Sequence, residues 1–267
     1  MISAKTRKKN SVSIEGNLDA PQTIVFAHGF GTDQTAWDDV KQAFKADYRL
    51  VLYDNVGGGA ADVEAYSPIK YNTLNTYADD LLTILHELEI TGALVFAHSV
   101  SSMISVVAAN KSPESFSKLV LVGASPRYLN DDSYVGGFTQ DALNNMYETM
   151  TTSYYAWVSG FSAVAMGNPD KPELGAEFAE SLLAIRPDIA LSVSKVIFES
   201  DVRDQLPVLD VPTLLLQSQH DIAVPPEVAD YLHTHIRGSI LQQLDAEGHF
   251  PHISAPGVVV KAIQSFL

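Results

Sequence analysis

This chain of 267 residues carries one stretch that indicates its fold, Ala93-Leu94-Val95-Phe96-Ala97-His98-Ser99-Val100-Ser101. Its first five residues are apolar and typical of a buried strand, and a helical pattern runs from residue 102 to residue 110. A strand that turns sharply into a helix exposes the side chain at the turn, here Ser99, above the edge of a sheet. The residues two before and two after it must be small, because strand and helix approach closely, and Ala97 and Ser101 are small.

Similar apolar runs recur along the chain and alternate with helical patterns. We predict strands at residues 23–27, 49–53, 93–97, 118–122 and 213–216, and a weaker one at 240–244. Between residues 74 and 88, apolar side chains follow the spacing of one helix face. This alternation predicts an α/β fold with a mostly parallel central sheet flanked by helices.

Residues 126–210 interrupt the alternation, because they contain helical patterns but no convincing strand. The interval is also rich in aromatic residues, as a lid over an apolar pocket at the carboxyl edge of a parallel sheet would be. We therefore expect a core made of residues 1–125 and 211–267, with residues 126–210 inserted as a helical lid.

Ser99 needs a base and an orienting acid to become a nucleophile. In folds with this strand–turn–helix, the acid and then the histidine follow the serine along the chain, which points to Asp221 and His249. His252 competes with His249 as the base, and we expect His220 to lie beside Asp221 and position it.

The first strand leads into the loop His28-Gly29-Phe30-Gly31, whose glycines allow a close approach of the main chain. We predict an oxyanion hole formed by the backbone N–H groups of Phe30 and Val100. His28 is interpreted as a structural residue of this loop. The glycine-rich residues 54–59 match no nucleotide-binding motif and are expected to form a flexible loop at the rim of the site.

Composition excludes several classes of protein. The formal net charge of −15 argues against nucleic-acid binding, and the absence of cysteine excludes disulfides and thiolate chemistry. No histidine spacing suggests a metal site, and no cofactor is expected. Four of the first ten residues are basic, so we expect a solvated N-terminal arm. No apolar run approaches the length that spans a membrane, and we expect a soluble, cytoplasmic protein.

From about residue 26 to residue 256, the chain resembles the α/β-hydrolase superfamily. Within it, the chain resembles the group of the bacterial stress-response regulator RsbQ and the plant strigolactone and karrikin receptors. The strings that carry this resemblance in the core are His28-Gly29-Phe30-Gly31-Thr32-Asp33-Gln34, His98-Ser99-Val100-Ser101 and Glu247-Gly248-His249-Phe250-Pro251-His252. Those in and around the lid include Ala124-Ser125-Pro126-Arg127-Tyr128, Ala156-Trp157-Val158-Ser159-Gly160-Phe161 and Phe198-Glu199-Ser200-Asp201-Val202-Arg203.

The resemblance implies a V-shaped lid of four helices over a small apolar pocket. By this resemblance, the pocket positions are Phe30, Tyr128, Phe138, Trp157, Phe161, Phe178, Phe198 and Phe250. Trp157 and Phe161 lie four residues apart, so they share one face of a helix. That face is directed either toward Ser99 or toward another helix of the lid. The chain departs from the family in Ala97, which stands where a glycine is usual, and in Phe250, where Leu or Cys is common.

Two hypotheses of function follow, both centred on the same residues. The first is a serine hydrolase that acts on a small apolar ester or a butenolide-type lactone through Ser99, His249 and Asp221, without a cofactor. The alternative is a ligand-sensing signalling protein with slow turnover, whose lid engages a partner protein. Perhydrolysis or C–C bond cleavage with the same three residues also stays open.

Overall fold

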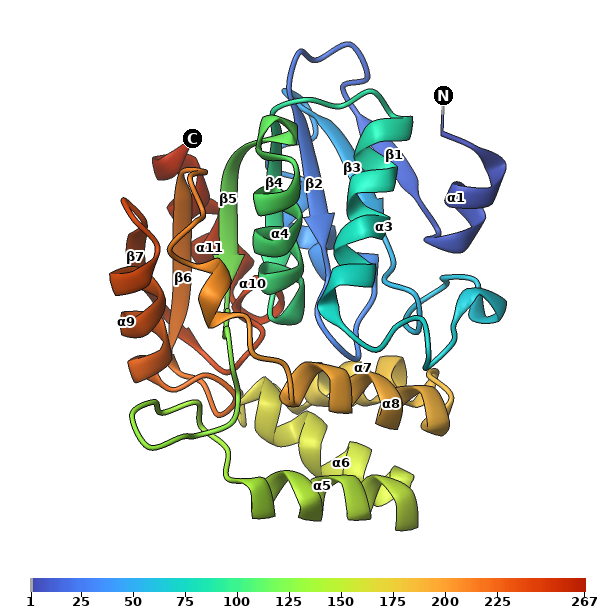
Figure 1. The fold of residues 1–267 in the computed structure, drawn as a ribbon, viewed down its shortest axis with the longest axis vertical. Coiled ribbons are helices and arrows are strands. Elements are labelled where there is room, and N and C mark those ends of the chain that lie inside the picture. Colours follow the sequence, from blue (N-terminus) through green and yellow to red (C-terminus); the bar gives the residue numbers. More distant parts are fainter. Residues whose placement is uncertain (1) are drawn as a thin grey trace.

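The computed structural model describes residues 2–267 and contains a seven-stranded sheet in the order β1-β3-β2-β4-β5-β6-β7 (Figure 1). Only β1 runs antiparallel to its neighbour, β3. Each of the other neighbouring pairs is parallel, as predicted. The strands are β1 Ser13–Gly16, β2 Thr23–Ala27, β3 Arg49–Tyr53, β4 Ala93–His98, β5 Phe116–Val122, β6 Thr213–His220 and β7 Ile240–Glu247.

The helices surround this sheet and cap one end of it. Those of the core are α1 Ala4–Lys9, α2 Asp38–Lys41, α3 Leu74–Glu87, α4 Val100–Lys111, α9 Pro226–His235, α10 Pro251–Ser254 and α11 Pro256–Phe266. Those between β5 and β6 are α5 Gln140–Thr152, α6 Tyr154–Met166, α7 Pro172–Leu183 and α8 Pro187–Phe198. The expected helix at residues 74–88 and the expected strands are confirmed, and β6 and β7 run several residues further than expected.

Alternate side chains of each strand enter two separate cores, because successive side chains of a strand point to opposite faces. Val25 of β2 belongs to the core under α3 and α4. Its neighbours Ile24 and Phe26 belong to the core under α2 and α11. The sheet is therefore covered on both faces, which explains why the strands read as continuous apolar runs.

The N-terminal segment is not the solvated arm that the sequence suggested. Residues 4–9 form α1 and residues 13–16 form β1, which extends the sheet beyond β3. Lys9 pairs with Asp80 of α3, and the buried Asn10 exchanges two hydrogen bonds with Asp54. The arm prediction was wrong because the basic side chains find acidic partners on α3 and on the loop after β3, which only the folded chain brings near.

The four helices α5, α6, α7 and α8, which we name the lid, form a layer below the sheet at the carboxyl edge of the strands (Figure 1). Its two ends meet where the N–H of Val202 donates to the carbonyl of Pro126 over 3.0 Å. Asp201 pairs there with Arg127 at 2.8 Å and with Arg203 at 2.7 Å. These contacts hold both ends of the insertion together.

The order in which successive strands are added to the sheet reverses at β2, since β3 lies on one side of β2 and β4 on the other. Loops at such a switch point leave a crevice at the carboxyl ends of the strands. The loop after β2 and the turn after β4 both open there, beneath the lid. Residues 2–267 include no helix that is long and apolar enough to cross a membrane.

Candidate active site

Ser99 stands alone between β4 and α4 with φ 55° and ψ −126°. A non-glycine residue in this region is strained, and such strain is found where a side chain must be presented for function. Ala97 and Ser101 on either side are completely buried, as the close approach of strand and helix requires.

Ser101 contributes more than small size. Its hydroxyl donates to the carbonyl of His28 over 2.5 Å and accepts from the side-chain amide of Asn55 over 3.0 Å. A glycine at this position would leave both groups without that partner. Ser101 therefore ties the helix after Ser99 to the loop after β2, a role that sequence reasoning missed because it treated the residue only as a spacer.

The structure brings Ser99, His249 and Asp221 into one hydrogen-bonded line. Ser99 Oγ lies 2.9 Å from His249 Nε2, and His249 Nδ1 lies 2.8 Å from Asp221 Oδ2. The other carboxylate oxygen of Asp221 accepts the N–H groups of Ala223 and Val224, at 2.8 and 3.1 Å. The carboxylate is only 1% exposed, so its two partners on the backbone and its histidine replace water.

The lid holds the loop that carries His249. The N–H of His249 donates to the carbonyl of Ala165, in the last turn of α6, over 2.8 Å. Gly248, with φ 82°, lies against the backbone of Met166, and a Cβ atom on Gly248 would overlap that carbonyl oxygen. Gly167, which ends α6 with φ 65°, packs in turn on Gly248. Glycine is required at both positions because two backbones meet there.

The predicted oxyanion donors belong to two segments that adjoin Ser99, the start of α4 and the loop after β2. Val100 is the first residue of α4, where a backbone N–H has no partner within the helix. Among residues 2–267, no acceptor takes up the N–H of Phe30 or of Val100. Gly29 brings this loop within contact of the side chains of His98 and Ser99, since a Cβ on Gly29 would overlap the His98 ring.

His28 holds the loop after β2 in place, in agreement with its interpretation as structural. Its Nδ1–H donates to the carbonyl of Gly29 over 2.7 Å, and its Nε2 accepts from the N–H of Asn55 over 2.9 Å. Residues 54–59 are thereby tied to the loop that supplies Phe30. They form a hydrogen-bonded wall of the site rather than the free rim loop that the sequence suggested.

The two other histidines considered at sequence level lie away from the reacting atoms. His252 is completely buried, with its ring centroid 4.3 Å from that of His98 and 4.5 Å from that of Trp37. Burial and the nearby His249 lower the pKa of His252 to about 3. Of the two competitors for the base, the structure therefore places His249 against Ser99.

His220 does not position Asp221, and that expectation was wrong. Its side chain is exposed and its Nδ1 lies 3.0 Å from the carboxylate of Glu247 on β7. The reason is that β6 continues to His220, and successive side chains of a strand leave opposite faces.

Most of the predicted aromatic residues form two clusters, the first of which contacts Ser99. Tyr128, Phe138 and Phe198 contact one another with ring centroids 5.0 to 6.3 Å apart, and the hydroxyl of Tyr128 lies 3.3 Å from Ser99 Oγ. In the second cluster, the closest ring pairs are Trp157 with Phe161 at 5.0 Å and Phe178 with Phe250 at 4.5 Å. Phe161 also lies 6.1 Å from Phe178, which links the lid helices to the residue after His249.

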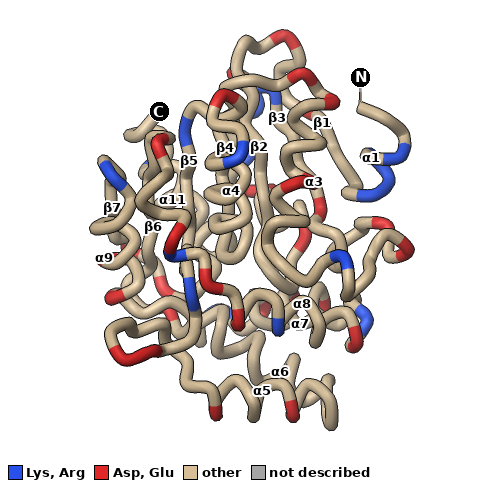
Figure 2. Tube along the Cα trace, viewed as in Figure 1, with Lys and Arg blue, Asp and Glu red and all other residues tan. Residues whose placement is uncertain are grey.

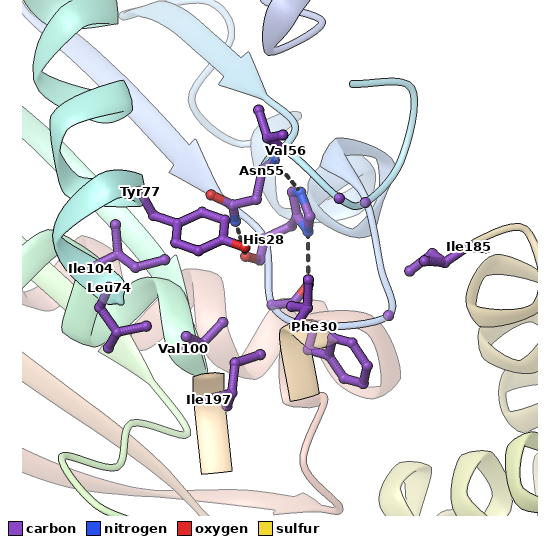
Figure 3. A pocket seen from close by; sticks show the side chains of 15 residues that line it. His28, Phe30, Asn55, Val56, Leu74, Tyr77, Val100, Ile104, Ile185 and Ile197 are labelled. Atoms are coloured by element: carbon purple, nitrogen blue, oxygen red, sulfur yellow. Dashed lines mark hydrogen bonds between the residues drawn. The ribbon is translucent and has the colours of Figure 1, made fainter. Parts of the chain in front are cut away.

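A small, partly open cavity of about 30 Å³ is lined in part by the loop after β2 (Figure 3). Of the predicted pocket residues, only Phe30 lines it. Its remaining side chains are mostly aliphatic and come from α3, α4, α8 and the turn before α8, among them Leu74, Tyr77, Ile104, Ile185, Val193 and Ile197. Sequence reasoning missed them because their apolar spacing is explained equally well by packing in the core.

No group of three or more His, Cys, Asp or Glu side chains within residues 2–267 is arranged to hold a metal ion. The groups that meet at the site are the chain's own serine, histidine and carboxylate. Those groups suit nucleophilic attack on a carbonyl followed by proton transfer.

Comparisons with known proteins agree with this geometry. A family model described as alpha/beta hydrolase fold matches residues 22–256. A karrikin insensitive 2 receptor from Petunia hybrida is 44% identical over 91% of this chain and 90% of its own length. A strigolactone esterase from Pisum sativum is 43% identical over 95% of both chains.

A solved structure of a hydrolase from Oleispira antarctica is similar over 98% of this chain and 95% of its own, with a TM-score of 0.94 and 31% identity. The resemblance to the α/β-hydrolase superfamily and to the group of the strigolactone and karrikin receptors is thus confirmed over most of the chain. The chain belongs to the α/β-hydrolase family.

Proposed function

We propose that this protein is a serine hydrolase for a small apolar ester or a butenolide-type lactone. The observation that carries the proposal is the hydrogen-bonded line from Ser99 through His249 to Asp221, beside two N–H groups without an acceptor. The aromatic cluster of Tyr128, Phe138 and Phe198 beside Ser99 favours an apolar substrate. The similarity to a strigolactone esterase supports a lactone or ester as the substrate class.

In the proposed mechanism, Ser99 Oγ attacks the carbonyl carbon while its proton passes to His249 Nε2. Asp221 accepts from Nδ1–H, keeps the imidazole in the required tautomer and stabilises the imidazolium. The N–H groups of Phe30 and Val100 donate to the oxyanion of the tetrahedral intermediate. The carbonyl–oxygen bond of the ester then breaks, and the leaving oxygen takes the proton from His249.

The acyl group is then bonded to Ser99, and water releases it by the reverse roles. His249 removes a proton from the water, whose oxygen attacks the acyl carbonyl. The bond to Ser99 Oγ breaks and Oγ recovers the proton from His249. With a lactone, the leaving oxygen stays attached to the acyl chain, so one hydroxy acid leaves the site.

Trapping the acyl-enzyme tests this proposal. The protein is mixed with p-nitrophenyl acetate, quenched in acid within one turnover, digested and analysed by mass spectrometry. We expect an added acetyl group on the peptide that contains Ser99, and no acetyl group and at least about a thousandfold lower turnover in Ser99→Ala. Turnover by Ser99→Ala within threefold of the unmodified protein would exclude the serine mechanism.

We also propose that Trp157 and Phe161 form a wall of the substrate pocket, as the family resemblance implies. Phe161 is half-buried and stacks on Trp157, so Phe161→Ala should widen the apolar site. We expect kcat/KM for a bulky ester to rise relative to a short ester, with a small change in melting temperature. A large loss of stability with an unchanged ratio of the two substrates would place Phe161 in the lid's own core.

The alternative function, a ligand sensor with slow turnover, is favoured by one contact. The backbone N–H of His249 donates a hydrogen bond to α6 of the lid, so a displacement of His249 would also move that helix. α6 carries no charged residue, as its tan colour in Figure 2 shows, and it exposes the side chains of Tyr155 and Val164. Such a surface suits a protein partner. The similarity to a karrikin insensitive 2 receptor supports this reading.

Kinetics separate the two functions. A hydrolase turns over many substrate molecules per protein molecule, at rates of about one per second or faster. A sensor releases about one product per protein molecule and then stalls, with a change in melting temperature on adding the ligand. Repeated rapid turnover of a butenolide without such a shift would exclude the sensor.

A further inference from the structure

The oxygen of the nucleophile has a second neighbour besides the base. The hydroxyl of Tyr128 lies 3.3 Å from Ser99 Oγ, and His249 Nε2 lies 2.9 Å from the same atom. Within residues 2–267, Ser99 Oγ is the one hydrogen-bond partner of the Tyr128 hydroxyl. Both side chains are buried, so the contact belongs to the interior of the site.

The direction of this hydrogen bond follows from the groups around it. His249 Nδ1–H donates to the carboxylate of Asp221, so Nε2 carries no proton and accepts the one from Ser99. A serine hydroxyl has a single proton, and therefore Ser99 Oγ can only accept from Tyr128. Burial raises the pKa of Tyr128, so its hydroxyl keeps the proton that it donates.

The ring of Tyr128 is held in place by the segment between β5 and α5, which connects the core to the lid (Figure 1). The N–H of Phe138 donates to the carbonyl of Tyr128 over 3.0 Å, and a Cβ atom on Gly136 would overlap that carbonyl. The rings of Phe138 and Phe198 pack on the ring of Tyr128. These contacts keep the hydroxyl of Tyr128 directed toward Ser99.

The hydrogen bond from Tyr128 changes in strength as the charge on Ser99 Oγ changes. In the free protein Oγ is a hydroxyl, and it gains negative charge in the transition states in which its bond to the carbonyl carbon forms or breaks. A hydrogen bond to a charged oxygen is roughly twice as strong as one to a neutral oxygen. In the acyl-enzyme Oγ is an ester oxygen, a poor acceptor because its lone pair is delocalised into the carbonyl.

This difference makes the hydroxyl of Tyr128 more valuable in deacylation than in acylation. An interaction accelerates a step to the extent that it is stronger in the transition state than in the starting state. Acylation starts from the free serine, which already accepts from Tyr128, whereas deacylation starts from the acyl-enzyme, in which that bond is weakest. When the bond between the acyl carbon and Oγ breaks, His249 returns a proton to Oγ, and Tyr128 keeps its own.

We propose that Tyr128 is a catalytic residue that donates a hydrogen bond to Ser99 Oγ when this oxygen leaves the acyl group, and that it thereby sets the lifetime of the acyl-enzyme. The proposal rests on the proposed serine hydrolase function and adds a further side chain to its mechanism. By shortening the life of the acyl-enzyme, Tyr128 favours repeated turnover.

Single-turnover kinetics of Tyr128→Phe test the proposal, with the protein in excess over p-nitrophenyl acetate. Release of p-nitrophenol measures acylation, and acid quenching followed by mass spectrometry of the peptide with Ser99 measures the loss of the acetyl group. We expect deacylation to slow at least about tenfold, and at least about three times as much as acylation. An unchanged deacylation rate, or an acylation rate that falls as much or more, would overturn the proposal.

Tyr134→Phe is the matched control, because it removes a hydroxyl from the same segment. The hydroxyl of Tyr134 donates to the carbonyl of Arg127 over 2.9 Å and makes no bond to Ser99. The hydroxyl of Ser125 also donates to that carbonyl, which therefore keeps a partner in the variant. Both rates should stay within about twofold of the unmodified protein. A loss of deacylation as large as that in Tyr128→Phe would show that packing of the segment sets the rate, and would overturn the proposal.

A second acyl group tests where the hydroxyl of Tyr128 acts. Its bond is to Oγ and not to the acyl chain, so Tyr128→Phe should slow deacylation of the acetyl and the butanoyl enzyme by the same factor within about twofold. A larger difference between the two factors would place the hydroxyl against the acyl chain and overturn its assignment as a donor to Oγ.

The outcomes separate this proposal from the one on which it rests. Acetylation of Ser99 in the unmodified protein, and its absence in Ser99→Ala, report the serine mechanism without involving Tyr128. If Ser99 is acetylated but Tyr128→Phe deacylates at the unmodified rate, the role of Tyr128 is wrong and the serine mechanism stands. If Ser99 is never acetylated, the proposed function is wrong, and the role of Tyr128 fails with it.

Discussion

At the scale of single residues, hydrogen bonds fix the orientation of the side chains in the candidate site. One carboxylate oxygen of Asp221 accepts hydrogen bonds from two backbone N–H groups, and the other accepts a hydrogen bond from His249. His249 therefore has a fixed ring orientation, with Nε2 toward Ser99. Within residues 2–267 neither ring nitrogen of His252 has a hydrogen-bond partner, and the ring lies between those of His98 and Trp37.

The identity of the base is tested by two alanine variants. We expect His249→Ala to lose at least about a thousandfold in kcat for a p-nitrophenyl ester, because Ser99 then has no proton acceptor. His252→Ala should keep a measurable rate and instead lose stability, since it leaves a cavity beside Trp37. An inactive His252→Ala together with an active His249→Ala would reverse the assignment.

The buried histidines also predict how stability depends on pH. The pKa of His252 is about 3 in the folded protein and close to its ordinary value of 6.5 in the unfolded chain, and burial lowers the pKa of His98 in the same direction. Below pH 6.5 the unfolded chain binds protons that the folded protein does not, so the free energy of unfolding falls as the pH falls.

Between about pH 6 and pH 5, His252 alone should contribute about 1 kcal/mol of this loss per pH unit. Urea unfolding at several pH values measures it in the unmodified protein, in His252→Phe, which cannot titrate, and in His86→Gln as a control on the exposed face of α3. The slope should be smaller in His252→Phe only. Equal slopes in all three proteins would mean that His252 is protonated in the folded state.

At the scale of elements, the contact between α6 and the loop after β7 couples the lid to the base. Gly167 and Gly248 bring the two backbones together, and the carbonyl of Ala165 holds the N–H of His249. The predicted helices and strands were largely correct because their apolar spacing is a local property. The contact itself joins segments about eighty residues apart, as the bond between Asn168 and Glu247 shows, and no local pattern indicates it.

This contact predicts a large effect of Gly248→Ala. The added Cβ would overlap the carbonyl of Met166, so we expect a loss of roughly 3 kcal/mol or more in the free energy of unfolding. A displaced His249 should also lower kcat/KM by about a hundredfold in the molecules that remain folded.

Gly238→Ala is the matched control for this variant. Gly238 has a similar φ of 73°, but nothing lies within 4 Å of the position of its Cβ. It should lose only the roughly 1–2 kcal/mol that a left-handed backbone costs a residue with a Cβ, and keep its activity. If both variants lose the same stability and neither loses activity, the contact between α6 and the base does not matter.

At the scale of the whole molecule, the N-terminal segment reaches the site through the loop after β3. Asn10 bonds Asp54, the next residue Asn55 bonds His28, and His28 holds the loop that carries Phe30. A chain of hydrogen bonds therefore runs from the first helix to the proposed oxyanion hole. Figure 2 shows the basic residues of α1 at the far edge of the molecule, apart from the lid.

Asn10→Ala tests this connection. It removes the donor to the carbonyl of Asp54 and leaves that buried group unpaired, so we expect a loss of about 1–3 kcal/mol in the free energy of unfolding. kcat/KM should fall a few-fold because residues 54–59 are less well held. Asn17→Ala, whose side chain makes only an exposed bond, should change neither quantity, and an equal effect of both variants would contradict the connection.

The sequence by itself determined the strands, the turn at Ser99, the order of Asp221 and His249 and the helical insertion. Each of these depends on local spacing, on backbone sterics at one turn or on chain order, which a single chain displays directly. Only the tertiary structure decided that α6 of the lid holds the backbone of His249, that α1 and β1 join the core, and that the hydroxyl of Ser101 ties α4 to the loop after β2. These outcomes depend on distances between segments far apart in the chain, and those distances are set by how the whole core packs.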